Sequence, residues 1–198
     1  MRINRFPHFH RLKKLFSVNL CIYKICLGLK GFKALIKYLR DLTKADPLDL
    51  ENDPTVSQCL ELLSRLARLW RPILPASVYE KTMAGLVCCL ADELVQLVLS
   101  VKENVIGEEL ARCIANLYRP LLEKVPQLFN ETTDLEKIST KWSRLLQLVG
   151  LLTSPIFAVA SGWQTSGGHF SRQEIIHLLR VLFPGNAGKA AALDMMQD

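Results

Sequence analysis

The chain has 198 residues, which is enough for one hydrophobic core and one domain of ordinary size. Hydrophobic residues make up 49% of it and aromatic residues 8%, a composition that excludes a chain disordered throughout. The net charge of +6 is unevenly divided: residues 1–40 contain ten Lys or Arg and no Asp or Glu, whereas residues 41–198 have a net charge of −4. Partners must therefore be considered separately for these two parts.

The first part, residues 1–45, is predicted to be a basic extension with a helix over residues 12–42. A secretory signal is disfavoured because Lys24 interrupts the apolar stretch and no small-residue cleavage site follows. A mitochondrial presequence fits the absence of acidic residues but lacks the usual richness in Ser. Membrane-surface or nucleic-acid contact through residues 1–40 stays open as an alternative function. The simplest interpretation is that residues 1–45 are a divergent N-terminal segment, attached to the shortened form of a longer protein.

An acidic linker, residues 41–53, separates this extension from a second domain that we place at residues 46–198. Asp53 and Pro54 form a typical helix start, with an N-cap followed by Pro at the first helical position. The helix that follows has apolar residues at alternating spacings of four and three, which predicts one buried seam: Val56, Leu60, Leu63, Ala67 and Trp70. The prolines of the segment 71–75 end it.

The next predicted helix, Ser77–Val101, is the most apolar in the chain and approaches the length of a membrane span. Asp92 and Glu93 lie in the middle of its apolar stretch, where acidic side chains are costly in lipid. A helix buried in a bundle is therefore the better interpretation. The two carboxylates are adjacent in sequence and point in different directions, so they form no catalytic pair.

Three further segments are predicted before the C-terminal part. A helix over residues 108–122 is expected to kink or end at Pro120. A long helix follows over residues 134–152, then a short apolar segment at 156–160 and a loop at 162–168. Each helix has a narrow apolar seam, and Pro or Gly separates it from the next.

The clearest helix start in the chain is at Ser171. Ser171 and Glu174 have the spacing of a capping box, and Phe170 and Ile175 have the spacing of a hydrophobic staple around it. The helix is expected to end at Phe183, where Pro184 and Gly185 follow, and a short helix is expected over residues 186–196. Together these elements predict an all-α fold, an antiparallel helical bundle at the end of a rod.

Motifs for catalysis, metals or cofactors are missing from this pattern. The six Cys include no C-x-x-C pair, and His8 with His10 would give only two ligands in a basic segment. No nucleophile motif or phosphate loop occurs in the sequence. We therefore expect no enzyme activity, no metal, no cofactor and no small-molecule substrate, in a chain whose thiols stay reduced in the cytoplasm.

Several short motifs, in order, resemble the C-terminal region of the Zeste-White-ten centromere/kinetochore protein family. They are LPxxxYxKxM at residues 74–83, VPQLF at 125–129, KW at 141–142, the Trp- and Gly-containing loop 161–168, and SxxEIxxLxRxLF at 171–183. The resemblance covers about residues 55–193, and nothing before Asp46 is expected to share it.

The resemblance implies a non-enzymatic scaffold subunit whose C-terminal helices dock onto a large solenoid partner. It implies two complexes: the Rough Deal–Zwilch complex at kinetochores in mitosis, and a tether on the endoplasmic reticulum for Golgi-derived vesicles. The implied location is cytoplasmic and peripheral on that membrane, with indirect membrane association and no direct nucleic acid. Weak candidates for partner binding are Trp163, Phe170 and Phe183, each of which could equally be a core residue.

Overall fold

The computed structural model describes residues 55–103, 106–129, 139–165 and 168–196. These residues form seven α-helices and one short 3-10 helix, and none of them lies in a β-strand. In chain order the elements are α3 (Thr55–Trp70), α4 (Ala76–Leu99), α5 (Gly107–Lys124), η1 (Pro126–Leu128), α7 (Thr140–Leu152), α8 (Ile156–Thr165), α9 (Arg172–Leu182) and α10 (Lys189–Asp194). The predicted all-α fold is confirmed. The basic helix expected at residues 12–42 and the boundary placed at residues 45 and 46 lie outside the described residues.

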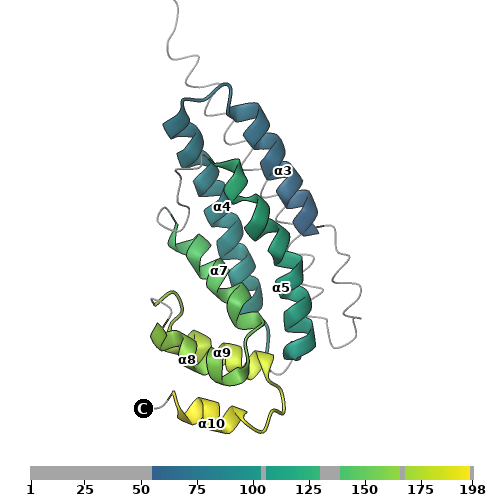
Figure 1. Ribbon diagram of the computed structural model, residues 1–198, viewed down its shortest axis with the longest axis vertical. Helices are drawn as coiled ribbons and strands as arrows, with labels where there is room; N and C mark the ends of the chain where they lie inside the picture. The colour runs from purple at the N-terminus through teal and green to yellow at the C-terminus, as the bar shows by residue number, and fades with distance from the viewer. Residues whose placement is uncertain (1–54, 104–105, 130–138, 166–167, 197–198) are drawn as a thin grey trace, which may run out of the picture.

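Four helices form the body of the bundle, and they alternate in direction along the chain (Figure 1). Helix α4 packs against α7, while α5 packs against both α3 and α7. The remaining helices, α8, α9 and α10, pack on one another at one end of the body, and α9 also contacts α4 and α5 (Figure 1). The C-terminal helices therefore close the end of the bundle that lies opposite the α3–α4 turn.

The seams predicted from helical spacing form one continuous core. All five predicted seam residues of α3 are buried, and so are Leu110, Ile114, Leu117 and Leu121 of α5. The largest side chains that are completely buried come from four helices: Met83, Leu94, Ile114, Tyr118, Leu121, Leu145, Leu148, Ile175 and Leu178. Burial of this apolar surface is the main force that holds the helices together.

Helix α4 passes the length and composition test for a membrane span, and 56% of its most apolar window is buried inside the molecule. Met83, Val87 and Leu94 are fully covered. Asp92 forms a salt bridge with Lys141 of α7, which also raises the pKa of Lys141 through that hydrogen bond. The prediction of a helix buried in a bundle is confirmed.

Pro120 does not end α5, so of the two expected outcomes, a kink or an end, the end is wrong. The helix continues through Pro120 to Lys124. Pro120 is exposed to solvent, whereas Leu117, Tyr118 and Leu121 beside it are buried. Tertiary packing of that buried face offsets the hydrogen bond that Pro removes.

The segment expected as a short apolar stretch followed by a loop is a helix, α8, which continues through Gly162 to Thr165. A glycine within a helix costs only about 1 kcal/mol relative to Ala, which packing of Val159 and Ala160 in the core can outweigh. Helix α7 begins at Thr140 with Ser139 as its N-cap, because the Ser139 side chain accepts a hydrogen bond from the Trp142 N–H. Residues 134–138, where the sequence predicts the first turns of that helix, lie outside the described residues.

Candidate interaction surface

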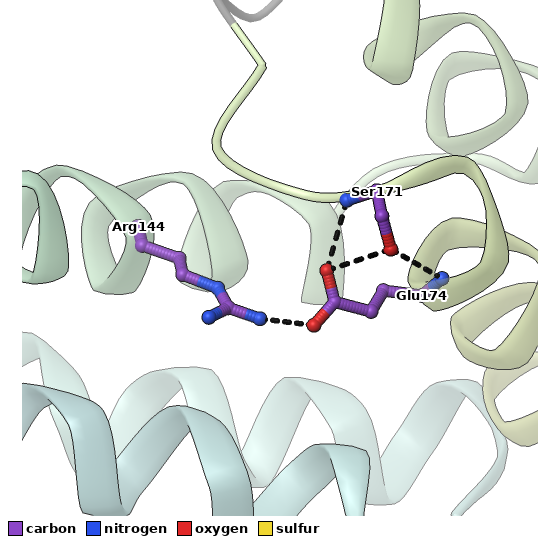
Figure 2. Close-up of polar contacts among 3 residues, drawn as sticks. All are labelled: Arg144, Ser171 and Glu174. Atoms are coloured by element: carbon purple, nitrogen blue, oxygen red, sulfur yellow. Dashed lines mark hydrogen bonds and ion pairs between the residues drawn. The ribbon is translucent and has the colours of Figure 1, made fainter.

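The start of α9 is connected to α7 by a small polar cluster (Figure 2). Ser171 Oγ accepts a hydrogen bond from the Glu174 N–H at 3.3 Å, and Glu174 Oε2 accepts one from the Ser171 N–H at 2.8 Å, which together make a capping box. The other carboxylate oxygen, Oε1, forms an ion pair with Arg144 of α7. One carboxylate thus closes the helix end and holds a neighbouring helix.

Phe170 and Ile175, on either side of this cap, are both buried. The guanidinium of Arg144 lies over the Phe170 ring, 4.8 Å from its centroid. Arg144 therefore combines a cation–π contact with an ion pair, and both contacts fix the position of α9 on α7. These side chains contact one another across the junction of α7 and α9, which favours a packing role.

The three aromatic residues predicted as weak candidates for partner binding lie in different places. Trp163 is in the last turn of α8, and its side chain is outside the part that the structure describes. Phe170 and Phe183 lie at opposite ends of α9, and both are buried. Phe183 borders a recess of about 460 Å³ between α5, the α7–α8 turn and the end of α9. The burial of these two rings favours a packing role.

That recess has few groups that could perform chemistry. Its titratable side chains are Glu108 and Arg112, both exposed, and Asn186 donates a long hydrogen bond of 3.5 Å to Glu108. No nucleophile lies beside a base among its lining residues. Within the described residues no group of three or more His, Cys, Asp or Glu could hold a metal ion, and Cys59, Cys88, Cys89 and Cys113 form no disulfide with one another. His8 and His10 lie outside the described residues.

At the other end of the bundle, the α3–α4 turn is fastened to η1. Tyr79 donates a hydrogen bond of 2.6 Å to the Leu128 carbonyl. Arg71 donates bonds of 3.3 Å to the carbonyls of Leu128 and Phe129, and its guanidinium lies 5.6 Å from the Tyr79 ring centroid. Burial is the main cause of a raised pKa at Tyr79, so its hydroxyl remains a donor. The motifs at residues 74–83 and 125–129 therefore meet in space.

Sequence reasoning missed the exposed apolar residues of this end. Large hydrophobic side chains are exposed at two places in the described residues: Leu69 (53%), Ile73 (70%) and Val78 (45%) at the α3–α4 turn, and Phe157 (49%) and Met195 (54%) on α8 and next to α10. The sequence did contain an indication at Leu69, which is apolar but does not lie on the buried seam of α3 that includes Val56 and Trp70. Exposed apolar side chains gathered at one place mark surfaces for contact with other molecules.

Fold and surface together define a class of protein: an all-α bundle with an exposed apolar end and, in its described residues, no convergent catalytic or metal-binding side chains. The chain belongs to the ZW10 C-terminal helical domain family, whose model matches residues 54–196. The resemblance inferred from the short motifs is thereby confirmed.

Relatives of known name agree with this family. The centromere/kinetochore protein zw10 of Drosophila melanogaster is 28% identical over 142 residues, which cover 70% of this chain and 19% of that protein. The zw10 protein of Drosophila grimshawi is 28% identical over 234 residues, covering 96% of this chain and 32% of that protein. The zw10 homolog of Rattus norvegicus is 25% identical over 152 residues, covering 70% and 19%. No solved structure matches the chain significantly.

Two facts follow from these coverages. The chain spans only about a fifth to a third of the length of these relatives. The Drosophila grimshawi alignment takes in 96% of this chain, so it includes residues before Asp46. The division of the chain at residues 45 and 46 stays a prediction.

Proposed function

We propose that this chain is a non-enzymatic scaffold subunit that docks onto a large solenoid partner. The observation that carries the proposal is the family match over residues 54–196. The relatives from Drosophila melanogaster and Rattus norvegicus are named as centromere/kinetochore proteins. A role in kinetochore assembly during cell division is therefore the first function to test for this chain.

The fold supports a scaffold role because its polar contacts serve to hold helices at defined positions. Asp92 joins α4 to α7, Glu174 joins α9 to α7 through Arg144, and Tyr79 joins α4 to η1. A bundle fixed in this way presents a surface of constant shape, which lowers the entropy that a partner must overcome on binding.

The resemblance suggests two settings for this docking. One is the Rough Deal–Zwilch complex at kinetochores in mitosis. The other is a cytoplasmic tether, peripheral on the endoplasmic reticulum, that captures vesicles arriving from the Golgi. In both settings the chain would contact protein subunits, and its association with membranes would be indirect.

Copurification tests the proposal directly. The full chain, with an affinity tag, is coexpressed with the Rough Deal-type solenoid subunit of the same organism. We expect the two proteins to coelute in size-exclusion chromatography. A tagged chain in dividing cells should also concentrate at kinetochores. Separate elution of two folded proteins, together with diffuse fluorescence in mitosis, would contradict docking.

One observation favours a second function, binding of a membrane or nucleic acid through residues 1–40. This part contains ten Lys or Arg and no Asp or Glu. Binding through it would weaken steeply with salt, because each neutralised phosphate releases counterions. Titrations of anionic liposomes and of duplex DNA at increasing NaCl concentration distinguish it from docking. A steep salt dependence that disappears without residues 1–40 would favour this alternative.

A further inference from the structure

We propose that the α3–α4 turn is a docking surface for an acidic amphipathic helix of a protein partner. We define this corner surface as Arg65, Arg68, Leu69, Ile73 and Val78, with the recess that Arg68 borders. The inference rests on the proposed function, because it assigns the contact point that a scaffold subunit requires.

Most of the exposed large apolar side chains belong to the α3–α4 turn. Of the five large hydrophobic residues that are exposed in the described part of the chain, three fall within residues 69–78. Leu69 is on the last turn of α3, Ile73 is in the connection, and Val78 is on the first turn of α4. The bundle core is already filled by the seam residues of both helices, so these side chains contribute nothing to it.

The charged side chains of this turn are all positive. Arg65, Arg68 and Arg71 are all exposed, and residues 62–79 contain no Asp or Glu. Neither Arg65 nor Arg68 forms an ion pair with any residue in the described ranges. The segment 62–79 therefore carries only positive charge, whereas the net charge of −4 in residues 41–198 comes from the linker 41–53. An acidic partner would be attracted to these arginines.

The surface at this turn is also hollowed. A recess of about 400 Å³ lies beside Arg68, and its lining comes from α3, the turn and η1: Ser64, Ala67, Arg68, Arg71, Pro72, Gln127 and Leu128. Recesses of this size fall in the range of small binding pockets. The bonds from Arg71 and Tyr79 to the carbonyls of η1 hold its walls in place. The recess is therefore preorganised for a side chain of a partner.

These three features identify a helix as the occupant. An amphipathic helix can lay apolar side chains on Leu69 and Ile73, insert one into the recess, and bring carboxylates to Arg65 and Arg68. The two arginines are three residues apart on α3, which spaces them by about 4.5 Å along its axis. An anionic membrane would satisfy the charge but would offer no side chain to fill the recess.

Binding is tested with a synthetic helical peptide that has Leu on one face and Glu on the other. Its controls are a peptide of the same composition in scrambled order and a peptide with Lys in place of Glu. Fluorescence anisotropy measures the affinity of each peptide for the full chain. Sedimentation with phosphatidylserine-containing vesicles measures lipid binding in parallel.

Two corner variants and one matched control carry the test. Arg65→Glu combined with Arg68→Glu, and separately Ile73→Ser, should each weaken binding of the acidic peptide by about tenfold or more. Arg112→Glu combined with Phe157→Ser changes an exposed cation and an exposed apolar residue away from the corner, and should leave binding unchanged. The Lys peptide should bind the charge-reversed variant better than the original chain. All variants should keep the original melting temperature, since every changed residue is exposed.

Three results would overturn the proposal: equal binding of the scrambled peptide, equal loss in the control variant, or vesicle binding that depends on the corner. Copurification with the solenoid subunit distinguishes the corner docking surface from the proposed scaffold function. If corner variants still copurify with the solenoid subunit, the corner assignment fails and the scaffold function stands. If the original chain never copurifies but binds the acidic peptide at the corner, the scaffold function fails and the corner assignment stands.

Discussion

At the scale of single residues, Tyr118 combines complete burial with an unpaired polar atom. Its hydroxyl has no hydrogen-bond partner among the described residues, although the ring is one of the largest side chains in the core. Burial raises the pKa of this phenol well above its ordinary value. An unpaired buried hydroxyl costs free energy, so the ring stabilises the fold while its oxygen opposes that effect.

Tyr118→Phe is therefore expected to increase the free energy of unfolding by about 1 kcal/mol, because it removes the buried hydroxyl and keeps the ring. Urea denaturation followed by circular dichroism measures the change. Tyr79→Phe is the matched control, and it should reduce stability because Tyr79 donates to the Leu128 carbonyl. Destabilisation by Tyr118→Phe would show that the hydroxyl has a partner in solution.

A dependence of stability on alkaline pH follows from Cys59. Burial raises the pKa of this thiol from 9.0 to about 12. In the unfolded chain the thiol ionises from pH 9.0 upward, whereas in the folded chain it stays neutral until about pH 12. The contribution of Cys59 to the free energy of unfolding should therefore be constant well below pH 9.0 and fall as pH rises from 9.0 to about 12.

Cys59→Ala should make that decline shallower, and thermal melts at a series of pH values measure it. Cys89→Ala is the control, because Cys89 is exposed and should leave the slope unchanged. An identical decline in all three proteins would assign the effect to other groups, of which Tyr118 is the first to examine.

Two substitutions at α9 separate the contribution of core burial to stability from that of helix capping. Leu179 is fully buried, and Leu179→Ala should cost about 2–5 kcal/mol. Ser171→Ala removes one capping bond and should cost about 1 kcal/mol. We expect Leu179→Ala to lower both the melting temperature and copurification with the solenoid subunit, and Ser171→Ala to shift the melt slightly and leave binding intact. A normal melt with lost binding in Leu179→Ala would instead place the docking face on α9.

At the scale of elements, α5 contains a proline that its position does not require. Pro120 is exposed inside the helix, where Pro is about 3 kcal/mol less favourable than Ala. Pro120→Ala should therefore stabilise the protein by about 1–3 kcal/mol, with the helix bounds unchanged. Denaturant unfolding of this variant, compared with Arg119→Ala at the neighbouring exposed position, measures the gain. A loss of stability would show that the path of α5 depends on Pro120.

The helices differ in how well their ends and lengths can be predicted from the sequence. The ends of α9 could be predicted because Ser171 with Glu174 and Pro184 with Gly185 act locally, within one turn of the helix. The length of α8 and the passage of α5 through Pro120 could not, since packing of distant residues overrides local preference in both. Spacing identified the buried seams but not their partners: nothing in α4 alone indicates that α7 covers it. The exposed corner was missed for the same reason, because exposure is a property of the assembled bundle.

At the scale of the whole molecule, the boundary between the basic extension and the helical bundle is open to a direct test. Removal of residues 1–45 should leave a cooperative melt, because the family match begins at residue 54 and the charge of the chain reverses just before it. Circular dichroism melts of the full chain and of residues 46–198 measure this. The opposite result would also be informative, because the Drosophila grimshawi alignment includes residues before Asp46. Loss of cooperative melting in the shorter chain would show that residues 1–45 belong to the folded unit.

The salt bridge between α4 and α7 has a consequence for synthesis on the ribosome. Helix α4 is complete at Leu99, but α7, which covers it, begins at Thr140, about 40 residues later. At about 5–20 residues per second, the nascent chain exposes its most apolar helix for roughly 2–8 s. During that interval Lys141 has not been made, so Asp92 is without its partner and costs about 2.5–3.5 kcal/mol near the middle of a would-be membrane span. The same carboxylate that later joins two helices thus opposes insertion of the emerging helix into a lipid bilayer.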